Sequence, residues 1–250
     1  MPKPRVALFV PCYINTLFPH VAMATMKLLE HFGYEVHYPD AQTCCGQPFA
    51  NSGAHGDAQP LAEHFVETFR GYDYIVAPSA SCVGMVRNHY KPYVGSHPDY
   101  RHIQSTVYEI CEFLHDVVKP HSFGTSFPHT VTLHQSCHGL RELELGVSSE
   151  LALPFYSKVL HLLEKVDDIT LLPMERADEC CGFGGMFSIH EPEISTRMGK
   201  DKLDYAEATQ AEYLAGFDSS CLMHLEGIAR RENRTVKMVH VAEIFAGTLQ

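Results

Sequence analysis

Short apolar runs along the chain alternate with longer amphipathic segments. Runs of strand length occupy 6–11, 35–39, 74–78, 131–133 and 169–173. From 21 to 32, apolar residues recur every three or four positions, which is the spacing of one helix face, and Gly33 supplies a helix stop. Related spacing predicts helices over 155–166 and 203–214. Strands that alternate with helices of this length predict parallel sheets covered by helices on both faces.

The order of these elements occurs twice. Each half contains a strand that ends near a cysteine, a helix, a second strand, a Cys-Cys-Gly loop, another helix, and a strand leading to a further cysteine. Each half also ends in related residues around Glu109 and Glu243. We therefore expect an α/β protein with internally duplicated βαβ, Rossmann-like halves and approximate two-fold pseudosymmetry, over residues 1–120 and 129–250. The connector lies within 115–128.

Eight of the nine cysteines follow this duplication. Each set has one cysteine, an adjacent pair followed by glycine, and a fourth cysteine: Cys12, Cys44, Cys45 and Cys82 in the first half, and Cys137, Cys180, Cys181 and Cys221 in the second. Because the carboxyl ends of parallel strands share one edge of a sheet, we expect each set to converge there. Four thiolates suit an iron–sulfur cluster or zinc. Cys111 has no counterpart and is expected to be a buried thiol.

Two other interpretations of the cysteines remain open. A redox-silent zinc ion held by four cysteines would make the protein a binding or scaffold subunit of a redox complex. Thiol–disulfide chemistry is disfavoured because neither adjacent pair has the Cys-x-x-Cys spacing of that class. No side chain is identified as catalytic.

Composition narrows the class of protein. The hydrophobic fraction of 45% and charged fraction of 20% are those of a folded globular chain. A formal net charge of −11 disfavours nucleic acid as a partner. The apolar runs are shorter than the roughly 20 residues of a membrane span. Nine cysteines without an export signal indicate the reducing cytoplasm.

Several motifs together resemble a known family. They are Cys12-Tyr13, Cys44-Cys45-Gly46-Gln47-Pro48, Pro78-Ser-Ala-Ser-Cys82, Cys180-Cys181-Gly182-Phe-Gly184-Gly185 and Cys221-Leu-Met-His224. This pattern resembles the tandem cysteine-rich CCG domain of one heterodisulfide reductase subunit, of the glycolate oxidase iron–sulfur subunit and, at this length, of lactate utilisation protein A. The resemblance implies a cytoplasmic iron–sulfur oxidoreductase that transfers electrons in the oxidation of L-lactate to pyruvate. It also implies two partner proteins, including a ferredoxin-type iron–sulfur subunit.

One departure from the family motif limits the ligand set. The fullest form of the motif has a fifth cysteine in each half, where this chain has Met85 and His224. Each site then has four thiolates, and we expect up to two clusters, of the [4Fe–4S] type. His224 is a further candidate ligand of the second site. Among the 17 histidines, His224 and His138 rank ahead of His20 and His134 as neighbours of a site.

Overall fold

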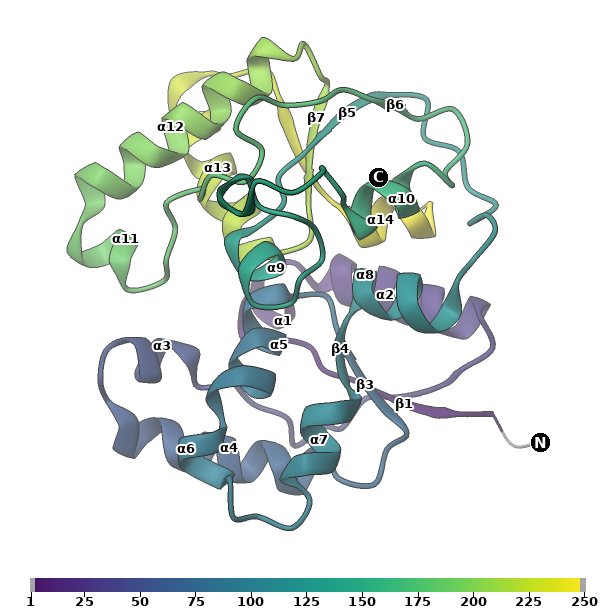
Figure 1. The fold of residues 1–250 in the computed structure, drawn as a ribbon, viewed down its shortest axis with the longest axis vertical. Helices are drawn as coiled ribbons and strands as arrows, with labels where there is room; N and C mark the ends of the chain where they lie inside the picture. The colour runs from purple at the N-terminus through teal and green to yellow at the C-terminus, as the bar shows by residue number, and fades with distance from the viewer. Residues whose placement is uncertain (1–2, 248–250) are drawn as a thin grey trace.

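Two four-stranded, all-parallel sheets form the centre of the protein (Figure 1). The computed structural model describes residues 3–247. The strand orders are β2-β1-β3-β4 and β6-β5-β7-β8. The strands are β1 Arg5–Leu8, β2 Glu35–His37, β3 Tyr74–Ala77, β4 Val107–Glu109, β5 Thr130–Leu133, β6 Thr170–Leu171, β7 Tyr213–Gly216 and β8 Lys237–His240. The equivalent strand orders confirm the predicted duplicated α/β fold.

Helices connect the strands in both halves. The first half contains α1 Cys12–Leu17, α2 Pro19–His31, α3 Gln47–Asn51, α4 His55–Phe69, α5 Ala80–Gly84, α6 Lys91–Val94, α7 Tyr100–Thr106 and α8 Ile110–Glu112, with π-helical turns η1 Met85–His89 and η2 Phe113–Val118. The second contains α9 Cys137–Arg141, the 3₁₀ turn η3 Ser149–Leu151, α10 Lys158–Leu163, α11 Phe187–His190, α12 Pro192–Ala208, α13 Ser219–Glu232 and α14 Val241–Ala246. Within 3–247, none of the helices has both the length and the apolarity to cross a bilayer.

The helix predictions hold in the first half and fail at boundaries in the second. Helix α2 matches the predicted segment, and Gly33 follows it with a φ of +87°. The helix predicted over 155–166 begins only at Lys158, because Ser157 caps it. The prediction over 203–214 is wrong at its end: α12 stops at Ala208, and the apolar run that follows is strand β7. A short apolar run fits either element until its neighbours are known.

The last strands of the two halves align differently from the sequence repeat. The repeat pairs Glu109 with Glu243, but in the sheets Glu109 occupies the position of His240. Both residues cap the helix that follows. The carboxylate of Glu109 accepts a hydrogen bond of 2.6 Å from the Cys111 amide, and Nδ1 of His240 accepts one of 3.2 Å from the Ala242 amide. The capping role is thus preserved while the residue changes.

One large hydrophobic core is shared by the two halves, and a smaller cluster lies within the second half. The large core contains residues of both sheets. Helices of the two halves also pack on each other, α2 on α14 and α10 on α8. Phe123, from the connection between the halves, stacks on Phe245 with ring centroids 4.4 Å apart. The boundaries 1–120 and 129–250 stay a prediction, because this core is continuous across them.

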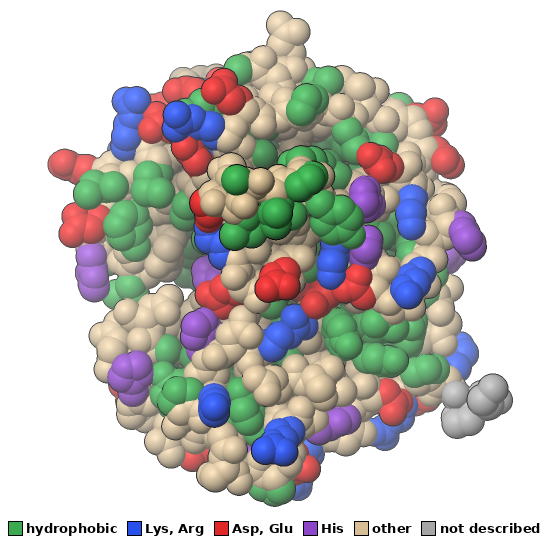
Figure 2. Space-filling model, viewed as in Figure 1, with side chains coloured by type: hydrophobic (Ala, Val, Ile, Leu, Met, Phe, Trp, Pro, Cys, Tyr) green, Lys and Arg blue, Asp and Glu red, His purple; other side chains and the backbone are tan. Residues whose placement is uncertain are grey.

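An apolar patch lies on the face of the molecule seen in Figure 2. Figure 2 shows apolar side chains gathered over the connection that follows α9. In that connection the relative exposure of Leu151, Leu153 and Phe155 is 58%, 61% and 66%. Exposed apolar clusters of this kind are typical of surfaces that meet another molecule.

Candidate metal centres between the two halves

The first cysteine set lies at the carboxyl ends of three strands. Cys12 opens α1 after β1, Cys44 and Cys45 lie in the loop after β2, and Cys82 lies in α5 after β3. The sulfur atoms of Cys12 and Cys44 are 3.9 Å apart, and those of Cys45 and Cys82 are 3.4 Å apart. The structure therefore brings all four predicted residues of this set together.

The second set repeats this arrangement. Cys137 opens α9 after β5, Cys180 and Cys181 lie in the loop after β6, and Cys221 lies in α13 after β7. The sulfur atoms of Cys181 and Cys221 lie within 4.8 Å of each other. Cys137 and Cys180 line the same pocket as these two residues. All four predicted residues of this set also converge.

A glycine turns the chain sharply after each cysteine pair. Gly46 and Gly182 have φ angles of +79° and +88°, a region that residues with a Cβ atom rarely adopt. The turn directs the Gly46 amide at the Cys44 sulfur, at 3.4 Å, and the Gly182 amide at the Cys180 sulfur, at 3.3 Å. Each Cys-Cys-Gly loop thus supplies a backbone donor to its own first cysteine.

These contacts give one thiol in each set the character of a thiolate. Hydrogen bonds from Cys12, from Cys45 and from the glycine amide lower the pKa of Cys44 to about 3. Equivalent bonds from Cys137 and Cys181 lower the pKa of Cys180 to about 2. The donors shift in the opposite direction: donating its proton to Cys44 raises the pKa of Cys12. Because the thiolate is the metal-binding form of cysteine, each set is prepared to hold a cation.

Both sets line one pocket between the halves. The cavity measures about 310 Å³, and its wall includes all eight cysteines of the two sets. Helices α3 and α11 stand on opposite sides of it (Figure 1). Across the pocket, Gln47 Nε2 lies 3.2 Å from His138 Nε2, and the ring of Tyr13 lies edge-on to Phe183 at 5.9 Å. The two candidate centres therefore share one space.

Asp218 connects the two sheets at the edges where the cysteine sets lie. It is 2% exposed, and it precedes α13 in the second half. Its carboxylate accepts hydrogen bonds from the first half, 2.9 Å from the Ser81 amide and 3.2 Å from the Ser81 hydroxyl. The Ser79 hydroxyl adds a donor at 3.4 Å. A buried carboxylate that accepts several hydrogen bonds thus joins the two halves next to the pocket.

The candidate histidines lie in different places. His224 lies beside α12, with Nε2 3.3 Å from the Ser195 carbonyl oxygen, and its role as a ligand stays a prediction. His138 lies in the pocket wall, with Nδ1 3.6 Å from the Cys137 sulfur. His20 instead approaches Glu243, with Nε2 3.6 Å from its carboxylate.

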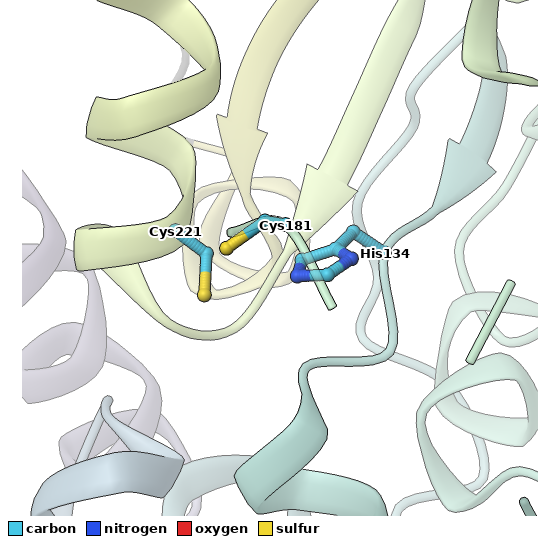
Figure 3. A group of neighbouring side chains, drawn as sticks. All are labelled: His134, Cys181 and Cys221. Carbon is cyan, nitrogen blue, oxygen red and sulfur yellow. The ribbon is translucent and has the colours of Figure 1, made fainter. Parts of the chain in front are cut away.

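The histidine that sequence reasoning ranks low is His134. Figure 3 shows its ring, from the segment after β5, beside the sulfur atoms of Cys181 and Cys221. A ring nitrogen and the two sulfur atoms all lie within 4.8 Å of one another, and all three residues are buried. A polar residue at the end of an apolar strand run is the signal in the sequence that could have indicated it.

Cys111 and Met85 both lie in the interior of the protein. Cys111 is fully buried in the core, where desolvation raises its pKa. Met85 is 2% exposed in the π-helical turn after α5. Neither lines the pocket between the halves.

The donor set fits an iron–sulfur cluster in each half. All nine cysteines, which lie within residues 3–247, have free thiols, and eight of them form the two converging sets. Iron–sulfur clusters are held by such groups of four cysteine thiolates. The eight residues of the two sets are the ones that would hold the clusters.

Comparisons with known proteins agree with this arrangement. The model of the CCG cysteine-rich domain matches residues 6–87 and again 131–226. Lactate utilization protein A of Exiguobacterium sp. is 41% identical over 248 residues, covering 96% of both chains. Lactate utilization protein A of Oceanobacillus iheyensis is 39% identical over 244 residues, also covering 96% of both.

A solved structure shares the fold. A hypothetical protein from Helicobacter pylori superposes on all of this chain with a TM-score of 0.65 and 9% sequence identity. The match covers 50% of that longer protein. The family follows from the two domain matches and from the relatives that cover nearly the whole chain. The chain belongs to the family of proteins with CCG cysteine-rich domains, and it carries this domain twice.

Proposed function

We propose that this protein is an iron–sulfur oxidoreductase subunit that transfers electrons during the oxidation of L-lactate to pyruvate. The observation that carries the proposal is the convergence of two four-cysteine sets on one pocket. The relatives named lactate utilization protein A supply the substrate class, since they match nearly the full length of this chain. The reaction releases two electrons and two protons; in this proposal the electrons pass through this chain to a partner protein, and the protons pass to water.

Each cysteine set holds one cluster, of the [4Fe–4S] type, in this proposal. A bound cluster supplies reversible one-electron transfer, which zinc does not. The chain's own residues bind and shield it. Cys45 and Cys181 are 3% and 1% exposed, so the protein excludes water from one side of each set. The amides of Gly46 and Gly182 hold thiolate charge at the other cysteine of each pair.

The surface supports work within a multiprotein system. The apolar patch over the connection after α9 offers a contact area for another protein (Figure 2). We infer two partner proteins of a lactate utilisation system, one of them a ferredoxin-type subunit that exchanges electrons with this chain in the cytoplasm.

Anaerobic purification tests the proposal. Iron and acid-labile sulfide should be present, and electron paramagnetic resonance should detect reduced clusters. Cys45→Ser and Cys181→Ser should each remove one of two signals, whereas Cys111→Ala, which changes a thiol of the core, should keep both. A protein that lacks both iron and sulfide after anaerobic handling would contradict the proposal.

A zinc-bound scaffold is the second candidate function. It is favoured by the group of His134, Cys181 and Cys221, whose ligand atoms lie close enough for a single ion. Stoichiometric zinc in anaerobic protein, without visible absorption by clusters, would favour the scaffold over the oxidoreductase.

A further inference from the structure

The imidazole of His134 is buried without a hydrogen-bond partner among residues 3–247. Its side chain is 1% exposed, and neither ring nitrogen forms a hydrogen bond with another described residue. A polar group buried in this way destabilises the folded state, because it loses its hydrogen bonds to water without replacing them. Native proteins rarely retain such a group without a compensating role, so the position of His134 needs an explanation.

The first half shows what packing alone requires at this position. The amide of Phe9 donates to the Val76 carbonyl at 2.9 Å, and the amide of His134 donates to the Ala215 carbonyl at 2.8 Å. These carbonyls belong to equivalent strands, β3 and β7, so Phe9 and His134 are equivalent residues.

Phe9 fills its position as an ordinary core residue. It is fully buried and lies edge-on to Phe65 and Phe69, with ring centroids 5.0 and 5.4 Å away. An apolar side chain is therefore sufficient for the fold at this point. Packing does not account for an imidazole at the same point in the second half.

The surroundings of His134 account for it. Its ring faces the sulfur atoms of Cys181 and Cys221, and the three ligand atoms lie within 4.8 Å of one another (Figure 3). Imidazole nitrogen is the commonest side-chain metal ligand, so a ring that faces two cysteine sulfur atoms is placed to share their metal centre.

We propose that His134 is a nitrogen ligand of the metal centre held by the second cysteine set. This inference rests on the proposed iron–sulfur function and adds a residue to its site. The second set then offers five donors, four thiolates and one imidazole, whereas the first offers four thiolates. The two centres of one duplicated fold are chemically unequal.

The residues that flank His134 extend this difference. Thr132 and Ser136 are buried, and their hydroxyl groups also lack hydrogen-bond partners within residues 3–247. The residues at the equivalent spacing from Phe9 are Ala7 and Pro11, which have no side-chain donor. The ligands of a cluster and the polar groups around it set its potential. The second centre should therefore differ in potential from the first.

The test isolates the second centre in the full-length protein. Cys45→Ser removes the first signal, and anaerobic, dithionite-reduced protein is examined by electron spin echo envelope modulation. A coordinated imidazole should give a strong nitrogen coupling. In protein from cells fed ¹⁵N-histidine, with His134 still present, the coupling should shift to that of ¹⁵N. His134→Phe, which introduces the side chain found in the first half, should abolish the coupling and shift the midpoint potential.

His138→Gln is the matched control, because His138 lies 3.6 Å from another cysteine of the same set. It should keep the strong coupling. A coupling that survives His134→Phe, or one that disappears only in His138→Gln, overturns the assignment. Protein with full iron and sulfide but no histidine coupling overturns it as well, and leaves the proposed function standing. Protein without iron and sulfide overturns both.

Discussion

Replacing Asp218 with alanine should loosen the contact between the two halves. The carboxylate is 2% exposed and accepts four hydrogen bonds, at 2.9 and 3.2 Å from Ser81, 3.4 Å from Ser79 and 3.0 Å from Ser220. A hydrogen bond to a charged group contributes about 1.5–3 kcal/mol, and the donors would lose their partner in a buried place. Because such bonds are not additive, we expect Asp218→Ala to lower the free energy of unfolding by about 4 kcal/mol.

Urea unfolding of the metal-free protein measures this change. Circular dichroism and the fluorescence of the 12 tyrosines should report one shared transition, which is the condition for a two-state free energy. Ser220→Ala removes one of the four bonds without touching the donors of the first half, so it should cost only about 1.5 kcal/mol. If Asp218→Ala costs no more than Ser220→Ala, the carboxylate does not join the halves.

Three further results are expected. In urea unfolding, Gly182→Ala should lower the free energy of unfolding by about 3 kcal/mol, and Gly46→Ala by about 1 kcal/mol. The reason is that an added Cβ atom would lie 2.5 Å from a backbone oxygen at Gly182, but no closer than 3.6 Å to any neighbour at Gly46. Equal costs for the two variants would contradict this reasoning. Burial raises the pKa of Glu109 well above 4.5, so the folded state binds its proton more tightly and stability falls as pH rises above 4.5. When the free energy of unfolding is measured from about pH 4 to 8, Glu109→Gln should make its decrease with pH smaller. An unchanged slope would show that Glu109 is not the group responsible. At pH 5, iodoacetamide should label Cys44 of the metal-free protein before Cys12, although Cys12 is more exposed. The reason is that the pKa of Cys44 is about 3, whereas the pKa of Cys12 is raised. Mass spectrometry of the labelled peptides gives the order of labelling, and labelling of Cys12 first would show that exposure governs the reaction.

Local patterns in the sequence are sufficient to predict the duplicated architecture and the convergence of each cysteine set. Strand-length apolar runs alternate with helices, and Cys12 and Cys137 come soon after the first strand of each half. Once the strands are parallel, their carboxyl ends lie at one edge, so residues far apart in the chain meet there. No long-range packing detail is needed for that inference.

The element boundaries and the alignment of the last strands depend on neighbouring strands. The run that begins at Tyr213 fits a helix or a strand until its pairing with β5 selects the strand. The pairing of Glu109 with Glu243 follows from similar residues in the two halves, whereas the sheets place His240 at the position of Glu109. Hydrogen-bond register, which is a property of two strands together, decides both points.

The docking of the two sheets decides how the cysteine sets relate to each other, and the strand order of the second sheet decides that His134 approaches its set. The common pocket depends on contacts such as that of Asp218 with Ser81, which lie 137 residues apart. His224 and Cys221 belong to one helix, α13, so their distance follows from the sequence. His134, far from Cys181 in the sequence, lies beside its sulfur because β5 pairs with β6. Proximity along the chain sets distance only within a helix or a turn; between elements, the packing of the sheets and helices sets it.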